Sequence, residues 1–280
     1  MVSMCVFGVV KIGGASGNRL EPLLEELACR FRSGERWVLV HGASGMMERL
    51  CAERGVEVRH VVSPSGYRSR FVGPLERCVF EEAAFAVSRS IAERMEALGV
   101  SCQVLTPAEG ERKDCLRSLE GGRVRILRGN YSGRVAEVRE DLILSALEQG
   151  KLPLLPPLAA CDGVLINVDG DRLAAAAAST LEASVMVMLT NTPGLLLDPS
   201  DPSSLISRVG LDEWDAADAA AQGNMKRKVL AAREALMGGV QRVVIGDGRL
   251  QNPIGRALGG GGTVFCSTRS AQCMETAASR

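Results

Sequence analysis

The stretch VFGVVKIGG at residues 6–14 runs from an apolar segment into a lysine and then a glycine pair. Such an apolar run is typical of a buried strand, and the glycines allow a tight turn into the next helix. At this kind of turn, backbone N–H groups can approach an anion, and the helix N-terminus adds a favourable dipole. Lys11 would add a full positive charge. Because the lysine precedes the glycines, unlike in a P-loop, the stretch fits either a phosphate site or an ordinary strand end.

The rest of the chain repeats this alternation of strand and helix patterns. Strand patterns occur at 5–11, 37–41, 57–62, 102–105, 152–155, 163–168, 184–190, 241–245 and 263–266. Helical patterns lie at about 18–32, 44–54, 78–98, 139–149, 171–182 and 224–237. The alternation predicts an α/β fold, a three-layer αβα sandwich with a mainly parallel central sheet.

Two stretches interrupt the alternation. Between 111 and 137, Gly121-Gly122 and Gly129-Asn130 flank a run at 124–127, which predicts a β-hairpin that projects from the sheet. Pro156-Pro157 and Cys161-Asp162-Gly163 then separate a first set of strands and helices from a second. We therefore expect an N-terminal lobe at 1–162 and a C-terminal lobe at 163–280 that share one continuous sheet.

Composition argues against several classes of protein. The 280 residues carry a formal net charge of zero, which disfavours a nucleic-acid partner. The first apolar stretch lacks the flanks of a signal peptide, and no run approaches the roughly 20 residues that cross a bilayer. The nine cysteines form no Cys-x-x-Cys pair, so zinc is not expected. We interpret them as small core residues in a reducing compartment, and we expect a cytoplasmic protein.

A second glycine turn follows the second predicted strand, at Val38-Leu39-Val40-His41-Gly42-Ala43-Ser44-Gly45. Two helix N-termini could therefore face one anion from neighbouring strands. A nicotinamide dinucleotide site is disfavoured, because the first turn lacks Gly-x-Gly-x-x-Gly and the second strand ends on a histidine instead of an acid. His41 is either a turn histidine that bonds to backbone, the commoner role, or an acid–base group.

Three polar clusters mark the second half of the chain. In 167–171 (Asn-Val-Asp-Gly-Asp), Asp169 or Asp171 could cap the following helix, or the cluster could bind a ligand at a strand's carboxyl end. In 225–228 (Met-Lys-Arg-Lys), three cations stand at the positive start of a helix, which is unfavourable unless an anion binds there. In 190–194 (Thr-Asn-Thr-Pro-Gly), a loop could hold a nucleoside or be an ordinary turn.

Taken in order, these motifs resemble the amino acid kinase family in its acetylglutamate kinase branch. They are Lys-x-Gly-Gly, Val-His-Gly, Asn-x-x-x-Asp, the Pro-Gly loop and Gly-x-Met-x-x-Lys, and the resemblance covers about residues 5–266. Residues 129–133, 167–171, 223–228 and 252–254 are similar to the kinases that act on an amino acid held by the carrier protein LysW. The resemblance implies a carbamate kinase-like fold and a homodimer.

The resemblance also implies an activity. It is ATP-dependent phosphorylation, with Mg²⁺, of the distal carboxylate of LysW-linked 2-aminoadipate or glutamate, in lysine or arginine biosynthesis. Free N-acetylglutamate is the alternative acceptor, and a catalytically silent sensor is the alternative from another class. The chemistry suits the residues, because a carboxylate is already a nucleophile at neutral pH and needs no general base. Catalysis then depends on alignment and on stabilising charge, which lysines and backbone N–H groups provide.

Single residues receive roles from the same resemblance. Lys11 and Lys228 would contact the transferring phosphoryl group from two sides, with Asp171 between them. Arg70 would bind the acceptor's α-carboxylate, with Arg68 as a rival, and Asn167 would contact its α-substituent. Backbone N–H groups would come from Gly13, Gly14, Gly42 and Ala43. ATP would lie against Thr190, Asn191, Gly194 and Met225, and no protein residue is expected to bind metal.

Two features bear on the acceptor. Ala43 stands where the family usually has a second glycine, so we expect its methyl group to limit how closely substrate approaches this turn. The segment 111–134 has three acidic residues and seven basic ones, Arg112, Lys113, Arg117, Arg123, Arg125, Arg128 and Arg134. A basic hairpin on a neutral chain suits an acidic protein partner such as LysW, although a solvated hairpin would have the same composition.

Overall fold

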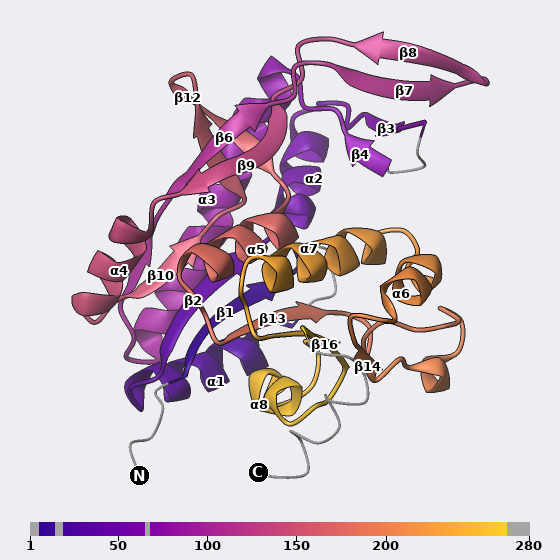
Figure 1. Cartoon of the computed structure of the whole chain (residues 1–280). Helices are drawn as coiled ribbons and strands as arrows, with labels where there is room; N and C mark the ends of the chain where they lie inside the picture. The colour runs from indigo at the N-terminus through magenta and orange to yellow at the C-terminus, as the bar shows by residue number, and fades with distance from the viewer. Residues whose placement is uncertain (1–5, 15–18, 65–67, 268–280) are drawn as a thin grey trace.

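The central sheet carries the fold. The computed structural model describes residues 6–14, 19–64 and 68–267 (Figure 1). Eight strands are ordered β14-β16-β15-β13-β1-β2-β10-β5, and every neighbouring pair is parallel except β15 with β16. Their bounds are β1 Phe7–Ile12, β2 Arg36–His41, β5 Cys102–Val104, β10 Leu152–Leu155, β13 Val185–Thr190, β14 Arg208–Val209, β15 Arg242–Asp247 and β16 Thr263–Cys266. The predicted mainly parallel α/β sheet is confirmed.

Helices cover both faces of this sheet (Figure 1). Their bounds are α1 Glu21–Arg32, α2 Ser44–Glu53, α3 Pro74–Ala97, α4 Glu140–Glu148, α5 Gly170–Thr180, α6 Trp214–Ala220, α7 Met225–Met237 and α8 Pro253–Leu258, with a 3₁₀ turn at Pro202–Ser204. The strand and helix patterns in the sequence did not indicate α6 or α8, which are short. In the described part of the chain, no helix has both the length and the apolar character needed to cross a bilayer.

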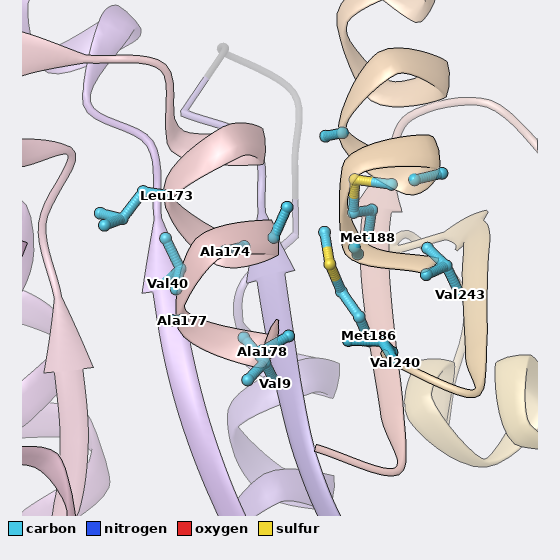
Figure 2. Packing of buried hydrophobic residues seen from close by; sticks show 14 of the residues in the cluster. Val9, Val40, Leu173, Ala174, Ala177, Ala178, Met186, Met188, Val240 and Val243 are labelled. Atoms are coloured by element: carbon cyan, nitrogen blue, oxygen red, sulfur yellow. The ribbon is translucent and has the colours of Figure 1, made fainter. Parts of the chain in front are cut away.

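Alternation along the strands divides the core into two layers. On β1, Val9 packs in a cluster with Leu173 of α5 and Val229 of α7, whereas the next residue, Val10, packs with Leu27 of α1. Successive side chains of a strand point to opposite faces, so one buried strand serves both layers. Figure 2 shows the first cluster, where alanines of α5 lie against the sheet. Small side chains let this helix approach the strands closely, which matters for the site below.

A closed four-stranded barrel stands beside the sheet. It contains β6 Ala108–Arg112, β9 Ser132–Val138, β11 Leu158–Cys161 and β12 Val164–Val168, in the order β11-β12-β9-β6. The expectation that 163–168 joins the central sheet is therefore wrong. Asp162 and Gly163 both have positive φ, 48° and 78°, the backbone that two-residue hairpin turns favour. This turn pairs β12 with β11 and directs β12 into the barrel.

The predicted hairpin is confirmed as β7 Leu116–Glu120 and β8 Arg123–Leu127. Gly121 and Gly122 form its turn with positive φ at both residues, a backbone that glycine adopts at little steric cost. The hairpin projects beyond the barrel, and β3 His60–Val62, which pairs with β4 Arg68–Arg70, lies against β7 (Figure 1). The wider segment 111–137 also supplies β9 and the end of β6, which the sequence pattern did not separate.

The cysteines follow the expectation only in part, because Cys51 is buried whereas Cys29 and Cys78 are exposed and do not lie in the core. Six of them are free thiols in the described residues, namely Cys29, Cys51, Cys78, Cys102, Cys115 and Cys161. Cys102 is half-buried, and its burial raises the pKa of the thiol to about 12. Cys266 is disulfide-bonded, which corrects the expectation that every cysteine is reduced. Spacing in the sequence does not show which thiols come within bonding distance, because the fold decides this.

Candidate active site

One buried carboxylate lies between two lysines at the carboxyl edge of the sheet. The Lys11 ammonium on β1 is 2.6 Å from Asp171 Oδ1, and the Lys228 ammonium on α7 donates to the two oxygens of Asp171 at 2.9 and 3.0 Å. These three residues are only 6–7% exposed. The sequence places them far apart, and the structure brings them together as predicted.

The charges in this cluster depend on each other. Burial is the largest influence on both lysines and lowers their pKa, while the charge of Asp171 opposes it. For Lys11 the attraction prevails and the pKa is raised, whereas Lys228, which is also repelled by Lys11, has a lowered pKa. Burial raises the pKa of Asp171, but the two ammonium groups outweigh it and hold the pKa well below its usual range. Asp171 is therefore ionised at neutral pH, and Lys228 is the more easily deprotonated lysine.

Helices α5 and α7 direct their N-termini to the same place. Asp171 and Lys228 meet near the starts of the two helices. The C-terminal ends are also in contact, because a Cβ atom on Gly238 would overlap the side chain of Ser179. The helices therefore run side by side in the same direction (Figure 1). Two positive helix ends converge beside two lysines, which favours an anion there.

The sequence left open which aspartate caps α5, and the structure assigns the cap to Asp169. Its Oδ1 accepts from the backbone N–H groups of Asp171 and Arg172 at 3.0 and 3.1 Å. Because the capping role is filled by Asp169, the Asp171 side chain is free to point toward the two lysines.

The two glycine turns pack backbone against backbone. A Cβ atom on Gly14 would overlap the backbone of Gly42, and one on Gly42 would overlap that of Gly14, so glycine is required at both positions. Gly42 N–H donates to the Ile12 carbonyl at 2.9 Å, and Gly13 N–H donates to that of Leu189 at 3.4 Å. These two N–H groups are thus already bonded within the protein, and the role of Gly13 and Gly42 in binding stays a prediction.

The other two expected N–H donors belong to Gly14 and Ala43. In the described part of the chain, the N–H groups of Gly14 and Ala43 have no protein acceptor. The Ala43 methyl group is 2% exposed and packs in a cluster with Met47 and Phe80. The expected obstruction of substrate by this methyl group is therefore wrong, since the side chain points into the core. Residues 15–18 of the first turn, including Gly17, lie outside the described residues.

His41 has the structural role instead of the acid–base one. Its Nε2 is 2.8 Å from the Ser88 hydroxyl on α3, and its Nδ1 is 3.2 Å from the Gly42 carbonyl oxygen. Burial and, to a lesser degree, the charge of Lys11 lower the pKa of His41 to about 4, although the bond to Gly42 opposes them. The imidazole is neutral at physiological pH and links the second glycine turn to α3.

The residues expected on the acceptor side lie on β12, a strand of the barrel, and on β4, which pairs with β3 beside the hairpin. Arg70, on β4, is nearly buried and donates to Glu48 Oε1 of α2 at 2.8 Å. Asn167, on β12, is half-buried, and its backbone N–H donates to the Tyr131 carbonyl at 3.0 Å. The Arg68 side chain and residues 65–67 lie outside the described part of the chain, so the rivalry between Arg68 and Arg70 stays a prediction.

The residues expected to hold ATP gather at the ends of β13 and α7. Thr190 ends β13, and its hydroxyl donates weakly to Asn191 Oδ1 at 3.5 Å. Gly194 allows a close approach, because a Cβ atom there would lie 2.7 Å from both Leu205 and Thr263. Met225 begins α7 and is half-buried. Since β13 is parallel to β1, this loop and the Lys11 turn share one edge of the sheet.

The sequence flagged the cations of 225–228 without finding their partners. Arg227 donates to Asp169 Oδ2 at 3.2 Å and to the Ser69 hydroxyl of β4 at 3.3 Å. The unfavourable placement of Arg227 and Lys228 at a positive helix end is thus offset by two carboxylates. Sequence reasoning also missed Glu48, the partner of Arg70. No spacing rule connects these residues, because they meet only through the packing of α2, α5 and α7.

Known proteins match this chain over most of its length. A family model described as the amino acid kinase family matches residues 7–247. The LysW-aminoadipate kinase of Deinococcus radiodurans is 43% identical over 91% of this chain and 90% of its own length. The chain belongs to the amino acid kinase family. It is therefore a kinase, with ATP as the phosphoryl donor that the family uses. The predicted resemblance is confirmed.

Further relatives carry related names. The LysW-aminoadipate kinase of Thermus thermophilus is 37% identical over 91% of this chain and 98% of its own. Among solved structures, N-acetylglutamate synthase of Neisseria gonorrhoeae has a TM-score of 0.74 and 23% identity over 94% of this chain, which spans 59% of that longer chain. Carbamate kinase of Giardia lamblia has a TM-score of 0.68 and 16% identity over 94% of this chain and 99% of its own. The similarity to these two solved structures confirms the predicted fold.

Proposed function

We propose that this kinase phosphorylates the distal carboxylate of 2-aminoadipate, glutamate or both, carried on LysW, and forms an acyl phosphate. The Lys11–Asp171–Lys228 cluster is the observation that carries the proposal, because it places two ammonium groups at the meeting point of two helix N-termini. The relatives named as LysW-linked kinases favour the carrier-bound acceptor over free N-acetylglutamate.

The proposed mechanism is alignment of two anions followed by charge stabilisation. The acceptor carboxylate attacks the γ-phosphorus of ATP, and the bond to the β-phosphate oxygen breaks as ADP leaves. Lys11 and Lys228 stabilise the negative charge on the phosphoryl oxygens, and Asp171 holds both ammonium groups in position. The N–H groups of Gly14 and Ala43 donate to the same oxygens. Such preorganised donors act where charge develops and need no reorganisation during the reaction.

The remaining groups position the two substrates. Arg70 binds the acceptor's α-carboxylate, with displacement of Glu48, and Asn167 contacts the α-substituent. The N-terminal lobe, residues 1–162, thus holds the acceptor together with Asn167 on β12, a barrel strand just past this boundary. The C-terminal lobe, residues 163–280, holds ATP against Thr190, Asn191, Gly194 and Met225.

Mg²⁺ enters this proposal with the nucleotide. The described residues contain no group of three potential metal ligands. The two carboxylates nearest the transfer point, Asp169 and Asp171, already bind cations of the protein. The donors present therefore fit a metal held mainly by ATP phosphate oxygens, where it would neutralise part of their charge.

The β7–β8 hairpin is the proposed contact for LysW. Of the seven basic residues in 111–134, three are paired with acids, namely Arg112 with Asp114, Arg125 with Glu120 and Arg134 with Glu111. In the described residues, no carboxylate pairs with the other four, Lys113, Arg117, Arg123 and Arg128. Cross-strand pairing places Arg117 beside Ile126 and Leu119 beside Val124 on one exposed face. This basic and apolar face suits an acidic protein partner. The proposed homodimer would leave this face accessible.

The proposal is tested by supplying ATP with either LysW bearing 2-aminoadipate or glutamate, or free N-acetylglutamate. Acyl phosphate is trapped with hydroxylamine, and ADP release is measured in parallel. We expect trapped product with a carrier conjugate and far less with the free amino acid. Turnover of free N-acetylglutamate alone would replace the proposed acceptor, and ATP binding without turnover of any acceptor would indicate a sensor.

A further inference from the structure

Arg227 connects the acceptor strand to the helix that carries a transfer lysine. One terminal nitrogen of its guanidinium is 3.2 Å from Asp169 Oδ2, and the other is 3.3 Å from the Ser69 hydroxyl. Ser69 directly precedes Arg70 on β4, and Arg227 directly precedes Lys228 on α7. A single side chain therefore spans from the residue beside the acceptor arginine to the residue beside the phosphoryl lysine.

The adjacent contacts form a compact frame. Asp169 caps α5, Asp171 holds both lysines, and Arg227 binds Asp169 from the α7 side. The side chain of Arg227 is 34% exposed, so it is partly shielded from water. Its neighbour Lys226 is exposed and has no side-chain partner in the described part of the chain. Of the two cations beside Lys228 at the start of α7, only Arg227 is joined to the acceptor strand.

We propose that Arg227 is a positioning residue that fixes β4, and with it Arg70, at the correct distance from Lys228. This inference rests on the proposed function, in which Arg70 binds the acceptor. Phosphoryl transfer needs the attacking carboxylate in line with the bond that breaks, and small displacements of the acceptor reduce the rate strongly. A forked guanidinium suits this role because its two terminal nitrogens can bind Asp169 and Ser69 at once.

The inference predicts which kinetic constants change. Loss of Arg227 should loosen β4 and leave the nucleotide loop at 190–194 intact. We expect Arg227→Gln to raise the acceptor KM about tenfold, the size expected for one charged hydrogen bond, and to leave the ATP KM unchanged. ADP release should exceed trapped acyl phosphate, because water can replace a poorly aligned acceptor. A purely structural role would lower thermal stability without this separation of the two KM values.

Three more variants make the test specific. Ser69→Ala removes only the contact to β4 and should raise the acceptor KM in the same direction. The double variant should be no worse than Arg227→Gln, because the two residues act through one contact. Arg227→Lys keeps the charge beside Asp169 but not both contacts, so it should restore thermal stability and leave the acceptor KM raised. Lys226→Gln is the matched control, with the same charge change one residue away.

Each outcome decides between the alternatives. Equal effects of Lys226→Gln and Arg227→Gln would overturn the inference in favour of a general charge effect. Additive effects in the double variant of Ser69→Ala and Arg227→Gln would also overturn it. An unchanged acceptor KM in Ser69→Ala would also overturn it, even if Arg227→Gln does not fold. If the wild-type kinase fails to phosphorylate a LysW conjugate, the proposed function is wrong. Normal wild-type turnover with unaltered Arg227→Gln kinetics would reject only the role of Arg227.

Discussion

The transfer cluster and the β7–β8 hairpin use charge in opposite surroundings. Lys11, Asp171 and Lys228 are 6–7% exposed and hold each other in fixed positions. Near the hairpin, the Arg134 and Glu111 side chains of one ion pair are 63% and 57% exposed. A buried charge that loses its partner is costly, whereas an exposed pair contributes little to stability. The cluster is thus suited to hold charge for chemistry, and the hairpin is suited to exchange partners.

The largest effect expected from this difference is that of Asp171→Asn. The substitution keeps the size of the side chain but leaves two buried ammonium groups without a counter-charge. We expect the free energy of unfolding to fall by about 3–5 kcal/mol, and phosphoryl transfer to be nearly abolished. Urea denaturation measures the first effect and hydroxylamine trapping measures the second.

Glu111→Gln is the matched control in the exposed region. It removes the carboxylate that pairs with Arg134, and the free energy of unfolding should barely change. A similar loss of stability in the two variants would contradict the distinction between buried and exposed charge.

The next largest effect is that of Lys228→Ala on the chemical step. The variant removes one of two ammonium groups beside the transferring phosphoryl group, and we expect kcat to fall about a thousandfold. The ATP KM should change much less, because the proposed nucleoside contacts lie elsewhere. Steady-state kinetics beside the exposed neighbour Lys226→Ala check this expectation, and an unchanged kcat would refute the role given to Lys228.

Sequence reasoning could identify the transfer cluster because each member has a simple position. Lys11 lies next to the end of a buried strand, and Asp171 and Lys228 lie in the first turns of helices. Carboxyl ends of neighbouring parallel strands share one edge, so the fold brings such residues together. Local pattern alone does not distinguish Asp169, the cap, from Asp171. The family resemblance, through its Asn-x-x-x-Asp motif, placed Asp171 between the lysines.

The barrel and the acceptor side were less predictable for a physical reason. β6 and β9 are partly polar, and β11 has only four residues, so these strands are defined by the strands they pair with. Local periodicity does not reveal such partners. The contact of Arg227 with Ser69 and the burial of the Ala43 methyl group likewise depend on how separate elements pack. The hairpin was predictable because its turn glycines lie between the strands they connect.

The buried imidazole of His41 should make the stability of the protein depend on pH. The pKa of buried His41 is lowered to about 4 from 6.5, so below pH 6.5 the unfolded chain binds a proton that the folded chain does not. Acidification from pH 6.5 to 4 should therefore reduce the free energy of unfolding by up to about 3 kcal/mol through His41. Urea titrations of the wild type and His41→Gln measure this, and the variant should lose less stability over that range. Parallel curves would contradict the neutral, buried assignment.

The smallest effect is expected at the hairpin, in Arg117→Glu. Arg117 lies on the exposed face with Ile126 and pairs with no carboxylate in the described residues, so its reversal should not change thermal stability. If this face binds an acidic carrier, the KM for the LysW conjugate should rise about three- to tenfold, with kcat unchanged. The increase should shrink at high salt, because exposed charges are screened. Lys151→Glu, just after α4, makes the same charge change away from the hairpin and should leave the KM unaltered. Equal effects of the two reversals would mean that net charge, and not this face, attracts the carrier.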